Sequence, residues 1–592
     1  MNKLIRAETA AVIAEIHVAP GDEVSAGALL LTTELMKMRH EIRAEAPARI
    51  EAVHVAVGDA LNGGEAMVSL SAPQSAAAEA VAREDEGPRP DFVEFEARMA
   101  LLEDDARPDA VAKRRAKGLR TARENVADLL DEGSFTEYGA LAVAAMRGTR
   151  PLEDLHARTQ ADGIVTGTGT VGGRPVAVMA VDYMVLAGTQ GFNHHRKMDR
   201  LIEVARREAL PIVLFAEGGG GRPNDTDVAM VMAAWLNVTS FRHFAAHPGP
   251  KIGIAAGYCF AGNAALFGVC DVRIAAEASY VGMGGPAMIE GGGLGRVAPE
   301  AVGPSDVQSK NGVIDLLVAD EAAAVAAAKT LIGLGEDRAA GAGDEEALRA
   351  VVPVDRTKAY DMRKAVAALV DDGAFLEFKR GFGVGAICGF GRIEGRAVGL
   401  VANNPLHLGG AIDAEAADKA ARHIQLCDRW GLPLVTLCDT PGFMVGPDVE
   451  ETGQVAHVSR LFLAGAHFSQ PLATVILRKA YGLGAMAMAG GGFDRPAFCC
   501  AWPTGEVGAM GLEGAVKLGA RDRLAAIGDD AEREAEYQRL VAELYERGKA
   551  LNAAALLEFD AVIDPATTRP ALSRVLAAAG PTRPGGRYVD AI

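Results

Sequence analysis

The sequence has few aromatic residues, no excess of positive charge and no long hydrophobic run, and each absence excludes a class of protein. Aromatic residues make up 5% of the 592 residues. Lys and Arg number 60 against 78 Asp and Glu, a net charge of −18 at pH 7, so neither a general nucleic-acid binder nor a binder of anionic membranes is expected. No run of 18 apolar residues occurs, and the N-terminal MNKLIRAETA lacks the apolar stretch of a signal peptide. These features predict a cytoplasmic protein.

The cysteines have no spacing that suggests a metal site or a disulfide framework. None of the seven belongs to a CxxC pair, which argues against a zinc ribbon and against a secreted disulfide scaffold, so no metal site is predicted. Hydrophobic residues make up 49% of the chain and glycines number 69, as in a globular protein, which at this length has about three to five domains. The cysteines are Cys259, Cys270, Cys388, Cys427, Cys438, Cys499 and Cys500.

Residues 71–92 are expected to form a linker. The stretch 71–90 reads SAPQSAAAEAVAREDEGPRP, which is rich in Ala, Pro and charge and has one Val as its only large apolar residue. Such a segment cannot bury a core. Its 20 residues could span about 60 Å when fully extended. The alternative is a surface helix within one domain.

The first 70 residues repeat themselves. HVAPGDEV at residues 17–24 recurs as HVAVGDAL at residues 54–61, 37 residues later. Alternating patterns such as VIAEIHV and IEAVHV are typical of short strands, and Gly21 and Gly58 follow them as turn residues. The repeat predicts a small β-sandwich of two similar halves, and the segment ELMKM (34–38) falls between them, where a hairpin would lie.

The MKM motif around Lys37 resembles the biotin-attachment motif of biotin carboxyl carrier domains. The resemblance implies that residues 1–70 form a biotinyl domain and that a biotin protein ligase attaches biotin to Lys37. Leu35 departs from the family, which more often has Ala or Ser there. Two alternatives are a lipoyl domain, whose lysine is not usually flanked by two methionines, and an ordinary exposed lysine.

The rest of the chain contains a second duplication. GTGTVGGRPV at residues 167–176 matches GFGRIEGRAV at residues 389–398, an offset of 222. At the same offset, LPIV (210–213) matches LPLV (432–435), Lys197 matches Lys419, Arg200 matches Arg422, Glu217 matches Asp439 and Gly262 matches Gly484. Several matches at one offset indicate two copies of one fold.

Each copy has the pattern of an α/β fold. VAVMAVD and AVGLVANN are continuous apolar runs, as in strands buried on both faces, and residues 197–209 and 419–430 have helical spacing. PIVLFAE and PLVTLCD are again buried strands. This order predicts mostly parallel sheets flanked by helices, with residues 93–340 as one half and residues 341–592 as the other.

Glycines cluster after two of the predicted strands. EGGGGR (217–222) follows PIVLF, and YGLGA (481–485) follows TVILRKA. Glycine lets backbone N–H groups approach a ligand closely, and two such groups can hold an oxyanion. The alternative is that these glycines only permit tight turns. Neither cluster has a nucleotide-binding spacing, so no ATP site is predicted.

The whole region from residue 95 to 575 resembles the carboxyltransferase of biotin-dependent acyl-CoA carboxylases, which consists of two crotonase-like halves. The resemblance is most specific between Gly399 and Ala485. The stretches that carry it are RENVADLLDEGSF (123–135), GTVGGRPVAV, GLVANNPLHLGGAIDAEAADKAARHIQLCD (399–428), LPLVTLCDTPGFMVGPDVEE (432–451), ILRKAYGLGA and DAVIDPATTR.

The resemblance implies two oxyanion holes that face each other across a subunit interface. In the first half the family's Gly-Gly falls on Gly219 and Gly220 and would hold the thioester oxygen of acyl-CoA as its enolate forms. In the second half Leu483 and Gly484 would hold the ureido oxygen of biotin through backbone N–H groups. The biotin nitrogen can take the α-proton, so no side-chain base is expected, and none is found. The family's usual Asp-Ser-Gly-Gly-Ala is replaced here by Glu217 and four glycines, which puts the acyl specificity in doubt.

Further residues are expected to bind substrate. Arg196, Lys197 and Arg200 could form a basic pocket for the CoA phosphates, the alternative being a solvated helix face. Gly482, Ala485 and Met486 flank the second glycine turn, and Met486 stands where propionyl-type members often carry Asp. His194 and His195 are adjacent on a predicted helix and face different directions, so one-site metal binding is not expected.

The sequence thus predicts a biotin carrier fused to a carboxyltransferase. It would transfer the carboxyl group of N-carboxybiotin on Lys37 to the α-carbon of an acyl-CoA. Alternatives are a biotin-dependent transcarboxylase or acyl-CoA decarboxylase component, a non-catalytic scaffold and a lipoyl-carrying acyltransferase. No stretch is left for an ATP-dependent biotin carboxylase, so a separate subunit is expected as partner, together with a homo-oligomer from dimer to hexamer. The acyl group, the direction of transfer and the oligomer size do not follow from the sequence.

Overall fold

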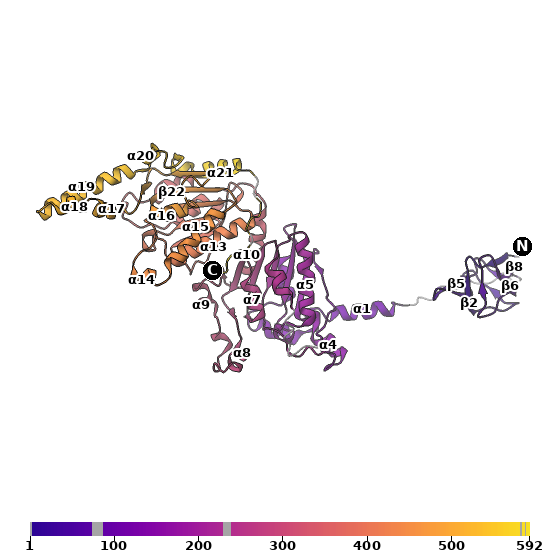
Figure 1. The fold of residues 1–592 in the computed structure, drawn as a ribbon. Coiled ribbons are helices and arrows are strands. Elements are labelled where there is room, and N and C mark those ends of the chain that lie inside the picture. The colour runs from indigo at the N-terminus through magenta and orange to yellow at the C-terminus, as the bar shows by residue number, and fades with distance from the viewer. Residues whose placement is uncertain (1–2, 74–86, 229–237, 581–582, 587) are drawn as a thin grey trace. The chain divides into compact units, whose positions relative to one another are not determined.

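The computed structural model describes residues 3–73, 87–228, 238–580, 583–586 and 588–592, which form two compact units, Met1–Phe95 and Glu96–Ile592 (Figure 1). Most of the expected linker, residues 74–86, lies outside the described residues. The helix α1 (Pro90–Ala100) begins within the expected linker. Among the described helices, none combines the length and the apolar character needed to cross a bilayer.

The N-terminal unit is the predicted β-sandwich. One sheet has the strand order β1-β8-β6-β3 and the other β5-β4-β2-β7. The two sheets enclose one apolar core, in which Leu30, Leu31 and Ile50 are fully buried. The strands are β1 (Lys3–Arg6), β2 (Ala11–Ile16), β3 (Glu23–Val24), β4 (Leu29–Leu35), β5 (Met38–Arg43), β6 (Ala48–Val53), β7 (Ala60–Leu61) and β8 (Ala66–Ser71).

The two halves of this sandwich exchange equivalent hydrogen bonds. Gly21 N–H donates to the carbonyl of Ile50, and Gly58 N–H, 37 residues later, donates to the carbonyl of Ile13, both at 2.8 Å. Gly21 has φ +102° and Gly58 φ +95°, a conformation that costs glycine little. The 37-residue repeat therefore corresponds to two similar halves, and each half supplies strands to both sheets.

The first half of the second unit is built on a seven-stranded sheet with the order β17-β15-β13-β12-β11-β10-β9. The strands from β11 to β17 pair in parallel, whereas β9, β10 and β11 pair antiparallel. Its elements are α2 (Pro108–Arg115), α3 (Ala122–Leu129), β9 (Thr136–Glu137), α4 (Leu152–Arg158), β10 (Ile164–Val171), β11 (Arg174–Val181), α5 (Phe192–Arg207), β12 (Ile212–Phe215), α6 (Ser240–Ala245), β13 (Lys251–Ala255), β14 (Tyr258–Phe260), α7 (Gly262–Gly268), β15 (Val272–Ala276), β16 (Tyr280–Gly282), α8 (Pro286–Gly291), α9 (Ser305–Lys310), β17 (Leu316–Val318) and α10 (Glu321–Ile332).

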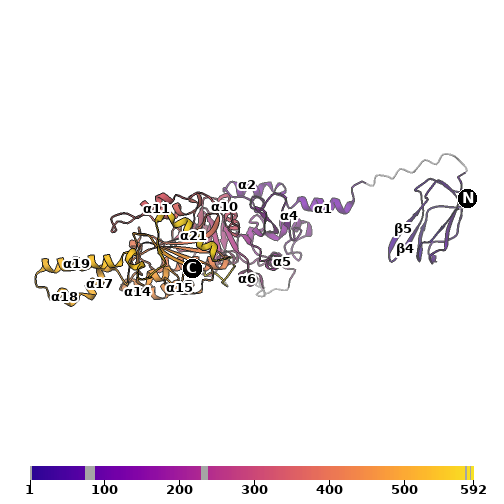
Figure 2. The ribbon, with the colours of Figure 1, turned by 90° about the horizontal axis from the view of Figure 1, so that it is seen from above.

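The second half repeats this sheet with the order β18-β19-β20-β21-β22-β23-β25, and β24 pairs with the end of β22. Its elements are α11 (Glu345–Val351), α12 (Arg363–Leu369), β18 (Leu376–Phe378), β19 (Ala386–Ile393), β20 (Arg396–Asn403), α13 (Ala414–Trp430), β21 (Leu434–Thr440), α14 (Pro447–Glu450), α15 (Gln454–His467), β22 (Leu472–Tyr481), α16 (Gly482–Met488), β23 (Phe498–Ala501), β24 (Glu506–Gly508), α17 (Leu512–Gly519), α18 (Arg521–Ala525), α19 (Asp530–Gly548), α20 (Ala550–Ala554), β25 (Ala561–Val562) and α21 (Thr568–Ala578). The helices α17, α18 and α19 project from this half as an arm (Figures 1 and 2).

The offset of 222 residues predicts element boundaries as well as sequence matches. The strands β10 and β19 begin and end 222 residues apart, as do β11 and β20, and α5 and α13 begin at the same offset. The predicted α/β class with a mostly parallel sheet is confirmed in both halves.

Buried charges join the two halves of the second unit. Asp315, in the first half, has no exposed side-chain surface and pairs with Arg273 at 3.1 Å and with Arg422 of the second half at 3.0 Å. Arg429 of the second half pairs with Asp271 of the first at 3.2 Å. The largest apolar core also contains residues of both halves. The two copies therefore form one packed body.

Candidate active site

Lys37 lies in a two-residue turn between β4 and β5. The last strand pair before the turn is Leu35 with Met38, so Met36 and Lys37 form the turn itself. Both have positive φ, +50° and +64°, the geometry that suits a tight hairpin and that costs a non-glycine residue about 1–2 kcal/mol. Met36 is 91% exposed and Lys37 is also exposed. The predicted hairpin is confirmed, and its lysine is accessible to covalent attachment.

The first glycine turn follows β12, and hydrogen bonds with β14 and α7 hold its backbone. Gly218 N–H donates to the carbonyl of Tyr258 at 2.6 Å, and Phe260 N–H donates back to Gly218 at 2.9 Å. The carbonyl of Gly219 accepts from the Asn263 amide at 2.8 Å. Because a trans peptide directs its C=O and the next N–H in opposite directions, the Gly220 N–H points away from Asn263.

The N–H groups of this turn are available to a ligand. Within the described part of the chain, Gly219 N–H and Gly220 N–H have no acceptor. Gly262 begins α7, where N–H groups lack intrahelical acceptors. A Cβ on Gly220 would lie 2.9 Å from Ala261 Cβ and 3.7 Å from Gly262 N, so this turn and the start of α7 are in close approach. The arrangement can hold one oxyanion between the two segments.

The second glycine turn, residues 481–485, follows β22 and begins α16, and it approaches the turn after β21 in the same way. A Cβ on Gly484 would lie 2.7 Å from Gly442 Cα and 3.2 Å from Phe443 N. Leu483 and Gly484 belong to the first turn of α16, so their N–H groups have no intrahelical acceptor. Leu483 is 60% exposed, whereas Gly484 is buried. Gly442 N–H is occupied, since it donates to Thr440 Oγ1 at 3.1 Å.

The turns after β12 and β21 are equivalent at the 222-residue offset, as are the starts of α7 and α16, and this relation identifies further candidate donors. Gly220 corresponds to Gly442, and Gly262 corresponds to Gly484. The predicted donors lie in the turn of the first half and at the helix start of the second half. Gly262 was not among them, although its match with Gly484 at the 222-residue offset is visible in the sequence.

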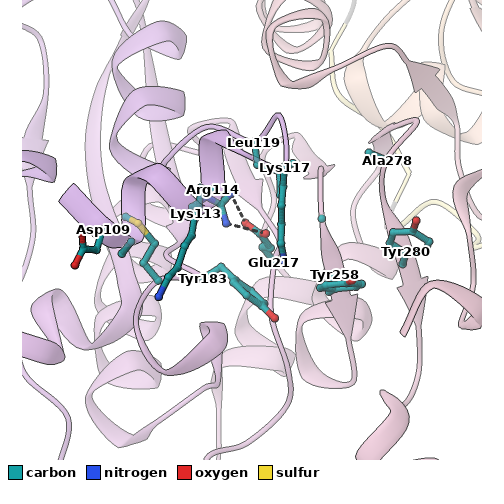
Figure 3. Close-up of a pocket in the computed structure, with 13 residues that line it drawn as sticks. Asp109, Lys113, Arg114, Lys117, Leu119, Tyr183, Glu217, Tyr258, Ala278 and Tyr280 are labelled. Carbon is teal, nitrogen blue, oxygen red and sulfur yellow. Dashed lines mark hydrogen bonds and ion pairs between the residues drawn. The ribbon is translucent and has the colours of Figure 1, made fainter. Parts of the chain in front are cut away.

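A cavity of about 600 Å³ opens beside the first glycine turn (Figure 3). Glu217, which directly precedes that turn, forms part of its wall, together with Lys113 and Lys117 from the α2 region. Neither lysine forms an ion pair with a described residue. The lining residues are Asp109, Ala110, Lys113, Arg114, Lys117, Leu119, Tyr183, Met184, Glu217, Gly257, Tyr258, Ala278 and Tyr280.

A buried ion pair forms one side of this cavity. Arg114 donates to both carboxylate oxygens of Glu217, at 3.0 and 2.9 Å. Burial raises the pKa of Glu217, and the charge of Arg114 opposes that shift. A Cβ on Gly257 would lie 2.4 Å from Glu217 Oε1, so Gly257 makes room for the longer carboxylate side chain that stands at position 217.

A second cavity, of about 720 Å³, lies beside the second glycine turn. Gly482 and Met486 line it, together with apolar residues such as Phe493, Val507 and Leu544. Ala485 is 1% exposed and does not belong to the lining. Of the three residues expected to contact substrate here, the structure therefore places two at the cavity.

The expectation that Lys197 binds phosphate is corrected by the structure. Lys197 is 6% exposed, and its ammonium group donates to the carbonyls of Ala161 at 2.9 Å and Ile164 at 2.5 Å. Burial lowers its pKa to about 8. Arg196 and Arg200 are exposed and line a separate cavity of about 470 Å³ on α5, which shares no lining residue with the cavity beside the first glycine turn.

The adjacent histidines lie in two different environments. His194 Nδ1 lies 3.2 Å from the carbonyl of Asp162, and His195 Nδ1 lies 3.2 Å from Ser240 Oγ. Burial lowers the pKa of both, to about 4 for His195. Among the described residues, no group of three or more His, Cys, Asp or Glu is placed to hold a metal ion.

Comparison with known families matches two regions of the chain. Residues 113–583 match the carboxyl transferase domain, and residues 3–70 match the family described as biotin-requiring enzyme. The propionyl-CoA carboxylase beta chain of Saccharopolyspora erythraea is 34% identical over 499 residues, which cover 79% of this chain and 89% of that protein. The methylmalonyl-CoA carboxyltransferase 12S subunit of Propionibacterium freudenreichii subsp. shermanii is 33% identical over 500 residues, 81% of this chain and 92% of that one.

Two solved structures are similar over most of the chain. A single-chain, multi-domain long-chain acyl-CoA carboxylase is 48% identical with a TM-score of 0.78 over 97% of this chain, which spans 56% of that longer protein. A transcarboxylase 12S structure, described as a hexamer assembly with methylmalonyl-CoA and methylmalonic acid bound, is 29% identical with a TM-score of 0.75 over 85% of this chain and 98% of that one.

Proposed function

The chain belongs to the carboxyl transferase family and carries a domain of the biotin-requiring enzymes at its N-terminus, and from this premise we propose that it transfers a carboxyl group from biotin on Lys37 to the α-carbon of an acyl-CoA. The two halves have the crotonase-like fold that the resemblance implied. The observation that carries the proposal is the matched pair of sites in the two halves, in each of which a turn after a strand closely approaches the start of a helix. Two such sites are needed because two oxygens develop negative charge in such a transfer.

The first glycine turn is proposed to bind the thioester oxygen. Removing the α-proton of an acyl-CoA places negative charge on this oxygen, and preorganised N–H groups stabilise such charge. Gly219 and Gly220 supply N–H groups from the turn, and Gly262 supplies one from the start of α7. Since these donors are main-chain groups held by the fold, the charge is stabilised without reorganisation at the moment of reaction.

The cavity beside this turn is proposed to hold the CoA moiety. Its apolar surface suits a pantetheine arm, and Lys113 and Lys117, which form no ion pair with a described residue, offer positive charge to the phosphates. Arg196 and Arg200 remain the alternative phosphate site that the sequence suggested. We favour the cavity lined by Glu217 as the CoA site, because Glu217 directly precedes the glycine turn. The two arginines line a different cavity.

The second glycine turn is proposed to serve the biotin side. When attached to Lys37, biotin supplies a ureido group that carries the carboxyl group between sites. Leu483 and Gly484 would donate their N–H groups to the ureido oxygen, with Gly482 and Met486 in the wall of the adjacent cavity. The exposed turn at Lys37 fits such a group, because the lysine needs no pocket of its own.

The partners and the acyl group are proposed from the relatives. The biotin-requiring domain needs a source of carboxyl groups, so we propose a biotin carboxylase as partner, together with a biotin protein ligase and a homo-oligomer. A short- or long-chain acyl-CoA is the substrate class, since the relatives carboxylate propionyl-CoA or long-chain acyl-CoA. All seven cysteines are free and buried, which suits a cytoplasmic enzyme.

A transcarboxylase is the second candidate, since the 12S subunit of a methylmalonyl-CoA carboxyltransferase is 33% identical to this chain. The same donors serve transfer in either direction. The test is an acyl-CoA panel with the biotinylated chain, a biotin carboxylase, ATP and bicarbonate. Carboxylated acyl-CoA is the expected product. Transfer between two acyl-CoA esters without any use of ATP and bicarbonate would favour the second candidate, and no transfer in either assay would overturn both.

A further inference from the structure

Asn263 is a fully buried side chain that binds the backbone of the first glycine turn. It follows Gly262 in the first turn of α7, and its exposed fraction is 0%. Its amide nitrogen donates to the carbonyls of Gly188 at 3.0 Å, Glu217 at 2.9 Å and Gly219 at 2.8 Å. Three carbonyl acceptors around one atom require a donor there, so the orientation of the amide follows from its surroundings.

These contacts connect the two donors of the acyl-side oxyanion hole. The Asn263 amide fixes the Gly219–Gly220 peptide, so the Gly220 N–H points away from it. The same residue is the chain neighbour of Gly262, whose N–H is the donor from α7. One side chain thus holds a donor of the turn at a set distance and angle from a donor of the helix.

Gln190 completes the network from a third segment. Its side-chain amide donates to Asn263 Oδ1 at 2.9 Å. Its backbone N–H donates to the carbonyl of Gly220 at 2.9 Å, and its carbonyl accepts from Arg222 N–H at 2.8 Å. A Cβ on Gly262 would lie 2.2 Å from Gln190 Oε1. A shift of Asn263 would therefore also move the segment around Gln190, which itself contacts the turn.

The second half of the protein lacks this arrangement. The residue 222 positions after Asn263 is Ala485, which has no polar side chain. The turn there is held instead by Thr440, whose hydroxyl donates to the Gly442 carbonyl and accepts from the Gly442 N–H, both at 3.1 Å. The Asn263 network is thus a property of the acyl side alone and not a requirement of the duplicated fold.

We propose that Asn263, supported by Gln190, is a positioning residue that sets the geometry of the acyl-side oxyanion hole. The inference rests on the proposed function. Asn263 touches neither substrate nor reacting atoms and acts through the N–H groups of Gly220 and Gly262. Its loss lets these donors separate, and catalysis by preorganised donors depends on their fixed placement.

The test is steady-state kinetics of Asn263→Ala, the residue type that the second half carries at this position. The expected result is a kcat about 10- to 100-fold lower with a KM for acyl-CoA within about threefold, because the interaction is realised in the transition state. Asn125→Ala is the matched control. Asn125 is 4% exposed and donates to Glu321 at 2.7 Å, and this variant is expected to lower the melting temperature while leaving kcat unchanged.

A second readout separates positioning from general damage. S-ethyl-CoA, a thioether without the carbonyl oxygen, is expected to bind Asn263→Ala and the unaltered chain with equal Kd in calorimetry. If Asn263→Ala does not fold, Gln190→Met carries the test, with an expected kcat about 3- to 10-fold lower. A kcat equal to that of the unaltered chain, or a loss of S-ethyl-CoA binding that matches the loss of activity, would overturn the inference. Lack of carboxylation by the unaltered chain would instead overturn the proposed function.

Discussion

Gly220 and Gly442, 222 residues apart, occupy the same place in two copies of one turn. The carbonyl of Gly220 accepts from Gln190 N–H at 2.9 Å, and that of Gly442 accepts from Ile412 N–H at 3.1 Å, with Gln190 and Ile412 also 222 residues apart. Each turn lies against the first turn of a helix. The duplication therefore preserves the close approach of turn and helix start as well as the fold, as expected when one molecule must stabilise two oxyanions.

Adding a methyl group to either turn should reduce activity. In Gly220→Ala the new Cβ would lie 2.9 Å from Ala261 Cβ, and in Gly484→Ala it would lie 2.7 Å from the backbone of Gly442. The donors must separate to relieve these contacts, and loss of one oxyanion donor lowers kcat by about 10²- to 10³-fold. Steady-state kinetics of the purified variants measures this loss.

The matched controls are Gly268→Ala and Gly514→Ala. Both glycines lie in helices, and an added Cβ would meet no atom within 4 Å. Their kcat should equal that of the unaltered chain, and the melting temperature should not fall. Equal losses in the controls and in the turn variants would contradict the assigned role of the turns.

Mixed oligomers should regain activity if each active site combines the first half of one subunit with the second half of another. Gly220→Val and Gly484→Val each disable one half. In a dimer with one copy of each, one site receives both defects and the other receives none. Co-expression with two affinity tags and double purification is therefore expected to give about half of the normal activity, whereas sites formed within single chains would leave the mixed oligomer inactive.

Removal of charge from the cavity of the first half should weaken acyl-CoA binding. Lys113 and Lys117 line this cavity without ion-pair partners among the described residues. The double variant Lys113→Ala and Lys117→Ala is expected to raise KM about 10-fold or more with little change in kcat, and the effect should shrink at high salt. The matched double variant Arg196→Ala and Arg200→Ala should leave KM within twofold. A raised KM in the arginine variant, with an unchanged KM in the lysine variant, would instead place the CoA phosphates on α5.

The junction of the two halves should lose stability in acid. Burial raises the pKa of Asp315, but Arg273, Arg422 and Lys379 outweigh it and lower the pKa from 3.8 to about 2. A carboxyl group with a lowered pKa stabilises the folded state above its unfolded value. About 2 kcal/mol should therefore be present at pH 7 and lost as the pH falls from 4 to 2.

Chemical denaturation at several pH values tests this expectation. Asp315→Asn leaves two buried arginines without their carboxylate and should lower the free energy of unfolding at pH 7 by about 3–5 kcal/mol. The free energy of unfolding of this variant should also no longer fall steeply between pH 4 and pH 2. If the free energy of unfolding of the variant fell as steeply between pH 4 and pH 2 as that of the unaltered chain, another group would be responsible for the acid dependence.

The fold could be predicted from the sequence because the two duplicated segments form the same strands and helices. Strand and helix boundaries in the two halves repeat at the offset that Gly167 and Gly389 define. The hairpin at Lys37 followed from its place midway in a 37-residue repeat. The residues of the halves' junction, such as Asp315 and Arg422, were not predicted, because their pairing spans more than one hundred residues and has no local pattern.

The site was predicted only where a local motif exists. Glycine clusters after apolar runs marked the two turns. Lys113 in α2 and Lys117 just after it belong to no recognisable motif, and only the fold brings them beside Glu217. Lys197 was misjudged because a helix exposes some of its residues and buries others, and its burial depends on carbonyls of the segment 161–164. Asn263 was not predicted because its acceptors, on Gly188 and on the segment 217–219, lie 44 to 75 residues before it in the sequence.

The decisive measurement is the transfer of a labelled carboxyl group from Lys37-biotin to acyl-CoA. The biotinylated chain is loaded with ¹⁴C-bicarbonate by a biotin carboxylase and ATP, freed of small molecules and mixed with acyl-CoA. We expect label to leave the protein and appear in carboxylated acyl-CoA. Lys37→Arg should never acquire label, whereas the control Lys3→Arg should, and Gly484→Ala should retain its label. Label that attaches to Lys37→Arg, or that leaves the unaltered chain without reaching acyl-CoA, would contradict it.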